Sequence, residues 1–124
     1  MRFDDFLMRA IQQLTQAIAR ILRLSREDRL EEAEAELGRA YDELLGPDRV
    51  YLEMVDPATL GNLLGTPEKT RVLAKLSMLE AGLALRRGDT ARAARLEARA
   101  RTLRDHAHDE DPRDGDGTLL DDLR

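Results

Sequence analysis

The chain has 124 residues, enough for one domain with a single hydrophobic core. Hydrophobic residues make up 42% of it and aromatic residues only 3%, so leucine, isoleucine and alanine must form most of the core, a composition typical of packed helices. The absence of cysteine excludes disulfides, cysteine-ligated zinc and thiol catalysis, and the net charge of −5 argues against nonspecific binding to nucleic acid. We therefore expect an all-α protein.

The amino-terminal segment up to Leu24 has apolar residues at alternating spacings of four and three, which line one face of a long helix. These residues are Phe3, Leu7, Ala10, Leu14, Ala17, Ile21 and Leu24. Further apolar residues widen the stripe, so the helix contacts two helices of its own chain, or one helix and a second subunit. In a homodimer the shared face would include Phe3, Leu7, Ile11 and Leu14.

The second expected helix ends at Gly46-Pro47, because glycine adopts the positive φ of a helix end and proline blocks continuation. Ser25 and Asp28 fit a capping box that would start this helix near residue 26, and the turn at 27–29 is the competing boundary. Either choice predicts an antiparallel pair of helices. The acidic residues between 27 and 43 are expected on its solvated face.

The middle of the chain begins with a short apolar cluster at 50–55 and continues with two helix start signals. Asp56-Pro57 predicts a brief helix that ends at Gly65, and Thr66-Pro67 predicts a fourth helix that runs to Arg87. A Gly-Asp turn then leads into a fifth helix from about Thr90 to His106. The count is about five helices, arranged as two hairpins around a short third helix.

The second hairpin resembles a tetratricopeptide repeat, in which small residues lie where paired helices cross and a Gly-Asp turn joins them. The matching residues are Ala81, Gly88, Asp89, Ala93 and Ala100. A weaker match covers residues 21–41, with its turn about 60 residues earlier, whereas the repeat has a period of about 34 residues, so the third helix separates the hairpins. The chain also looks like a bacterial family of all-helical, repeat-like domains without an assigned function. The resemblance implies a helical domain over residues 1–106.

Residues 107–124 are expected to form a flexible acidic tail, because the stretch from Asp105 onward holds eight acidic residues and few large apolar ones. His106 and His108 stand among these acids, but positions two apart do not share a helix face. We expect a solvated tail without a metal site or cofactor. The tail is expected to fold transiently over the arginines that precede it.

Residues 86–104 contain seven arginines and two acidic residues, which gives a local charge of +5. Arg92, Arg95 and Arg99 lie at i, i+3 and i+7, where they could bind carboxylates or phosphates bidentately. The expected target is the acidic tail, the second helix of this or another subunit, or an acidic partner peptide. Nucleic acid is disfavoured because no aromatic residues are interleaved for base stacking.

The sequence as a whole predicts a non-enzymatic helical module that binds another protein. The alternative is a small enzyme or ligand-binding domain, which a buried pocket holding Tyr41 or Tyr51 with arginine and glutamate side chains would indicate. No apolar run approaches a membrane span, and Asp4 and Asp5 differ from the charge pattern of a secretory signal, so a cytoplasmic location is expected. The partner and the oligomeric state are not predicted by any motif.

Overall fold

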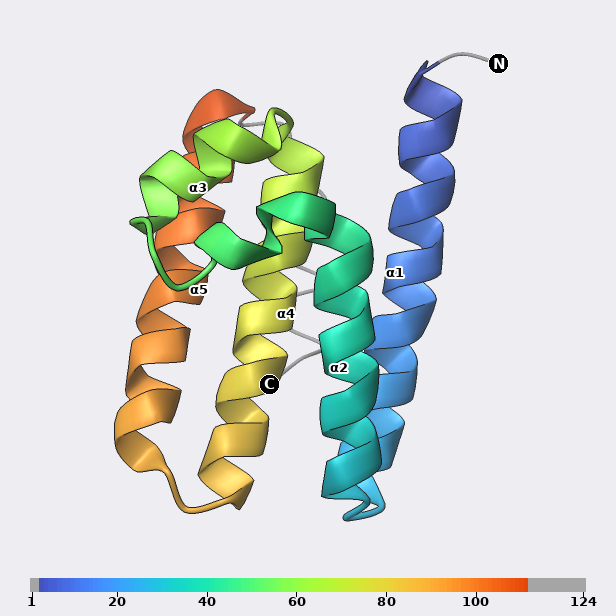
Figure 1. Cartoon of the computed structure of the whole chain (residues 1–124), viewed down its shortest axis with the longest axis vertical. Helices are drawn as coiled ribbons and strands as arrows, with labels where there is room; N and C mark the ends of the chain where they lie inside the picture. The colour runs from blue at the N-terminus through green and yellow to red at the C-terminus, as the bar shows by residue number, and fades with distance from the viewer. Residues whose placement is uncertain (1–2, 112–124) are drawn as a thin grey trace.

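The computed structural model describes residues 3–111, with side chains from residue 5 onward (Figure 1). Five α-helices and one 3-10 helix make up this part of the chain, which contains no strand. The elements are α1 (Phe3–Arg26), α2 (Leu30–Leu45), η1 (Gly46–Tyr51), α3 (Pro57–Leu64), α4 (Pro67–Arg86) and α5 (Thr90–Glu110). The all-α prediction is confirmed, whereas η1 was not expected from the sequence.

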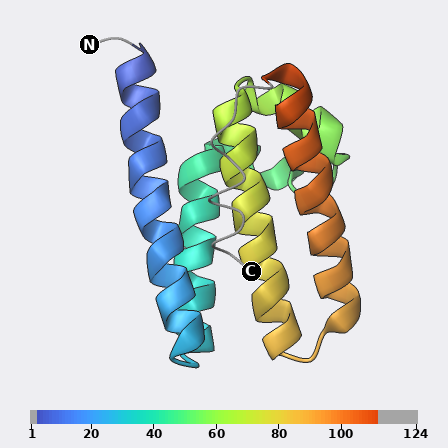
Figure 2. The ribbon, with the colours of Figure 1, turned by 180° about the vertical axis from the view of Figure 1, so that it is seen from behind.

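The four long helices lie side by side in the order α1, α2, α4, α5, as Figures 1 and 2 show from opposite sides. Helix α4 packs against α1, α2 and α5, and α3 lies across one end of α4 and α5. A helix that is covered on several sides needs apolar residues around most of its circumference. This explains why α4 has leucines and alanines around most of its circumference, and why even its residues Thr70, Lys75 and Ser77 are buried.

Side-chain caps begin α3, α4 and α5 at the residues that the sequence predicted. The side chains of Asp56, Thr66 and Asp89 each accept a hydrogen bond from the backbone N–H three residues later, at 3.1, 3.2 and 3.1 Å. Gly65 and Gly88 follow α3 and α4 with φ values of 83° and 82°, which glycine tolerates without strain. These caps are local, so the start of each helix needs no tertiary contact to be defined.

The capping box at Ser25 and Asp28 is not formed, and the competing turn at 27–29 is the boundary. Ser25 lies inside the last turn of α1, and α2 begins only at Leu30. The N–H of Arg29 donates to the carbonyl of Leu24 at 2.9 Å, and Asp28 takes a positive φ of 60°. The chain therefore closes α1 with backbone hydrogen bonds, and the side chain of Arg29 does not cap α2.

Helix α5 extends four residues beyond its predicted end at His106. Ala107 is fully buried, and the ring of His106 packs against Gly61 of α3, so tertiary contacts hold the last turn of α5 in helical form. His106 and His108 consequently belong to a helix and not to a tail, and the predicted boundary at residue 106 lies inside α5. The rest of the predicted tail, with its expected contact with the arginines, lies outside the described residues.

The predicted dimer face of α1 is partly used inside the subunit. Leu14 is only 2% exposed and belongs to the main core, so it is not accessible to a second copy. Leu7 and Ile11 are half-buried, and Phe6 beside them is 59% exposed. The difference arises because α1 has 24 residues and α2 has 16, so the first turns of α1 extend beyond the end of α2. A homodimer through the remaining face stays a prediction.

Within residues 3–111, none of the helices combines the length and the apolar content that crossing a membrane requires.

Candidate functional site

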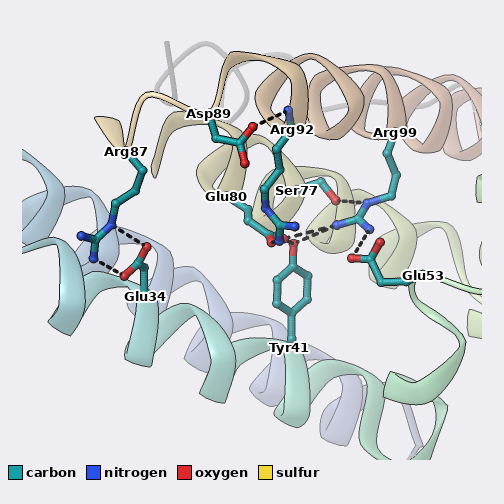
Figure 3. Close-up of polar contacts among 9 residues, drawn as sticks. All are labelled: Glu34, Tyr41, Glu53, Ser77, Glu80, Arg87, Asp89, Arg92 and Arg99. Atoms are coloured by element: carbon teal, nitrogen blue, oxygen red, sulfur yellow. Dashed lines mark hydrogen bonds and ion pairs between the residues drawn. The ribbon is translucent and has the colours of Figure 1, made fainter. Parts of the chain in front are cut away.

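A polar network ties α2, α4 and α5 together near the middle of the molecule (Figure 3). The Tyr41 hydroxyl donates to Oε1 of Glu80 at 2.7 Å and accepts from Nη2 of Arg99 at 3.2 Å. Nε of Arg99 donates to Oγ of Ser77 at 2.9 Å, and Nη2 of Arg92 donates to Oε2 of Glu80. One carboxylate thus holds a tyrosine from α2 and two arginines from α5.

In the network, two arginines share one largely buried carboxylate, that of Glu80. The side chains of Arg99 and Glu80 are only 11% and 16% exposed, so water screens their charges weakly. Two guanidinium groups share the single carboxylate of Glu80, and the next carboxylate, Glu53, lies 3.5 Å from Nη1 of Arg99 but is 69% exposed. An additional acceptor group beside these arginines would therefore be favoured.

Tyr41 acts in this network as a neutral hydrogen-bond donor. Burial raises the pKa of its hydroxyl, and the adjacent Glu80 carboxylate raises it further. The hydrogen bond to the same carboxylate raises the pKa of Arg92, whose charge is therefore secure. The arrangement suits binding and structural support, because its tyrosine has no tendency to lose its proton near neutral pH.

The three arginines predicted to bind a partner are divided by the fold. Arg92 and Arg99 are seven residues apart, almost two full helical turns, so both point from α5 towards the network with Glu80. Arg95 lies between them in sequence, and its side chain leaves the helix in a different direction, to one side of the network. It is exposed and makes no hydrogen bond or ion pair with any residue in the range 3–111. Of the three, only Arg95 is thus wholly accessible to a partner, because the guanidinium group of Arg99 already contacts Ser77, Tyr41 and Glu80. Partner binding by these arginines stays a prediction.

A groove of about 410 Å³ separates α5 from the segment that connects η1 to α3. Its floor contains the apolar residues Leu52, Val55 and Leu96, and the three arginines of the predicted set line it as well. We call this feature the arginine groove. Tyr51 and Met54, which flank Leu52 and Glu53 in sequence, leave 41% and 74% of their surface exposed. The apolar cluster at 50–55 is therefore only partly core.

A second cavity, of about 340 Å³, lies between α2 and the hairpin of α4 and α5. Tyr41, Glu80 and Arg92 line it together with Gly38 and Arg49, and we call it the tyrosine cleft. The guanidinium carbon of Arg49 lies 5.1 Å from the centre of the Tyr41 ring, a cation–π distance. Arg87 and Glu34 pair bidentately beside the cleft, with N–O distances of 3.1 and 2.6 Å.

A pocket with Tyr41, arginine and glutamate was the predicted mark of a ligand site, but Glu80 was not among the predicted residues. Glu80 stands between Leu79 and Ala81 in a helix that is otherwise apolar on most sides, and this is the signal that could have identified it. Its partners Tyr41 and Arg99 are 39 and 19 residues away in sequence, so their identity follows only from the fold.

No family model, no curated protein and no solved structure matches this chain. The tetratricopeptide resemblance consequently rests on the sequence patterns alone and stays a prediction. Within the described range of 3–111, no group of three or more histidine, aspartate or glutamate side chains is placed to hold a metal ion.

Proposed function

We propose that this protein is a non-enzymatic helical interaction module that binds an acidic peptide segment of a partner protein in the arginine groove. The observation that carries the proposal is Arg95, an exposed guanidinium without a partner in residues 3–111, beside an apolar floor. A carboxylate of the partner would pair with Arg95, and an apolar side chain next to it would cover Leu96 and Val55.

Glu53 supports the choice of a carboxylate as the group that is recognised. Its side chain reaches Arg99 from the opposite side of the groove, with 3.5 Å between Oε1 and Nη1. Because Glu53 is mostly exposed, this long contact contributes little to stability and can be exchanged for another carboxylate. The groove thus already holds one carboxylate of the chain's own beside an arginine, and this carboxylate would compete with that of a ligand.

Exposed apolar residues that are close in sequence to the groove residues Leu52 and Val55 support a partner that is amphipathic. Val50, Tyr51 and Met54 are three large apolar side chains with 64%, 41% and 74% of their surface exposed within five residues of sequence. A purely charged ligand would leave this surface in water, whereas a segment that alternates acidic and apolar residues would cover it. We therefore expect acidic residues interspersed with leucine or a similar residue.

The proposal is tested by fluorescence anisotropy with a fluorescein-labelled peptide in which Asp and Glu alternate with Leu. Arg95→Glu should weaken binding roughly tenfold, which corresponds to about 1.4 kcal/mol. Glu53→Gln should strengthen it, because the competing carboxylate of the chain is removed. Both effects should become smaller as salt rises, since salt screens exposed charges over about 8 Å at physiological ionic strength.

Arg101→Glu is the matched control, because Arg101 is an exposed arginine of the same helix that lines neither cavity. Equal weakening by Arg95→Glu and Arg101→Glu would mean that the peptide follows overall charge, and the groove would not be the site. Equal affinity for a single-stranded oligonucleotide of similar charge would instead favour nucleic acid as the target.

A further inference from the structure

The tyrosine cleft contains a glycine that opens its floor. Gly38 lies in the middle of α2, and a Cβ atom added to it would meet no atom within 4 Å. Glycine weakens a helix interior relative to alanine, and packing does not require it here. Its effect is to expose the α2 backbone to the cavity, with Leu37, Leu83 and Ala84 as apolar neighbours.

The arginines that line the cleft have unused hydrogen-bond donors, whereas most of the carboxylate oxygens there already accept a hydrogen bond. Of the six carboxylate oxygens of Glu34, Glu80 and Asp89, five already accept hydrogen bonds from the chain. On the donor side, Nε and Nη2 of Arg49, Nη1 of Arg87, and Nε and Nη1 of Arg92 donate to no residue within 3–111. A ligand that brings acceptors can therefore use these unused donors.

We propose that the tyrosine cleft is a binding site for a small organic carboxylate, distinct from the arginine groove although Arg92 lines both. Its carboxylate would accept hydrogen bonds from the unused guanidinium edges, of which Arg49 is the best positioned. Nη1 of Arg49 is fixed by the Gly38 carbonyl at 3.1 Å and by Asp42 at 2.6 Å, which orients the rest of the guanidinium group over the Tyr41 ring. The apolar body of the ligand lies over Gly38 and Leu83. A volume of about 340 Å³ accommodates such a molecule.

The test uses hexanoate as the probe and records ¹H–¹⁵N spectra of the full chain, in which the amides of Gly38, Leu83 and Ala84 report on the cleft, the last two also in variants of Gly38. Hexanoate should move these amides in a saturable way at about millimolar concentration. Hexanamide has the same shape without the charge, and acetate has the charge without the body. Each should bind at least about tenfold more weakly if both the carboxylate and the apolar body contribute.

Gly38→Leu should abolish hexanoate binding by filling the cleft. Gly82→Leu is the matched control, because Gly82 is also inside a helix with nothing within 4 Å of an added Cβ, but it is exposed and does not line the cleft. Arg49→Gln, which removes the oriented guanidinium and leaves the floor open, should weaken binding about tenfold. The proposal would be overturned if hexanoate binding were unchanged in Gly38→Leu or in Arg49→Gln. It would also be overturned if the wild type bound hexanamide equally well, or if hexanoate caused no saturable shift. The acidic-peptide assay on Gly38→Leu should match the wild type, so the two sites succeed or fail separately.

Discussion

Tyr41→Phe removes the central hydroxyl of the polar network and leaves the buried ring in place. The hydroxyl donates to Glu80 at 2.7 Å and accepts from Arg99 at 3.2 Å, so two hydrogen bonds that involve charged groups are lost together. Tyr41 itself is 2% exposed, and water cannot readily replace the missing group. We expect the free energy of unfolding to fall.

The expected loss is about 1.5–2 kcal/mol. A hydrogen bond to a charged group contributes about 1.5–3 kcal/mol to stability, and an unsatisfied buried partner adds to the cost of its loss. Two contacts reduce the effect here, because Glu80 keeps both arginines and Arg99 keeps Ser77. We therefore expect a loss in the lower half of this range. Such a loss is a large fraction of the free energy of unfolding of a small domain, which is about 5–15 kcal/mol.

Urea unfolding followed by far-ultraviolet circular dichroism measures this effect, since the chain has no tryptophan. With a slope of about 1–3 kcal/mol per molar urea, the midpoint should fall by about 1 M without a change of slope. Tyr51→Phe is the control, because Tyr51 is exposed and its hydroxyl makes no hydrogen bond within residues 3–111. A loss below about 0.5 kcal/mol for Tyr41→Phe, equal to that of the control, would refute the network as a stabilising element.

Three further changes test other contacts. Gly61→Ala should lower the free energy of unfolding in urea by about 1–2 kcal/mol, because its Cβ would lie 2.5 Å from Cδ2 of His106. Adding His106→Ala should restore most of this loss. A Gly61→Ala variant as stable as the wild type would contradict the close packing of α3 on α5. Asp56→Ala should cost about 1 kcal/mol through loss of the α3 cap, and an unchanged urea midpoint would show that the cap is dispensable. Arg87 lowers the pKa of Glu34, so their pair stabilises the fold above the ordinary pKa of a glutamate and loses its effect as the pH falls through the lowered pKa. The difference in unfolding free energy between wild type and Glu34→Gln should therefore be small and should shrink from pH 7 to pH 3, and a difference independent of pH would count against the pair.

The helices could be predicted from the sequence because their signals are local. Asp56, Thr66 and Asp89 cap helices through hydrogen bonds that span three residues, and Gly88 turns the chain through its own φ. The apolar stripe of α1 could likewise be recognised from the helical period alone. Ser25 shows where such local evidence fails, since two boundaries were compatible with the sequence and backbone hydrogen bonds at the end of α1 decided between them.

The site depended on the tertiary structure, because its contacts join residues that are far apart in the chain. The sequence placed Arg92, Arg95 and Arg99 on one part of a helix, but it gave no information on which of them α4 would meet. Tyr41 and Arg99 are 58 residues apart and come together only when α2 and α5 both pack beside α4. Local hydrogen bonds determine where helices begin and end, whereas the packing of their surfaces determines which charges are paired inside the subunit and which, like Arg95, face the solvent.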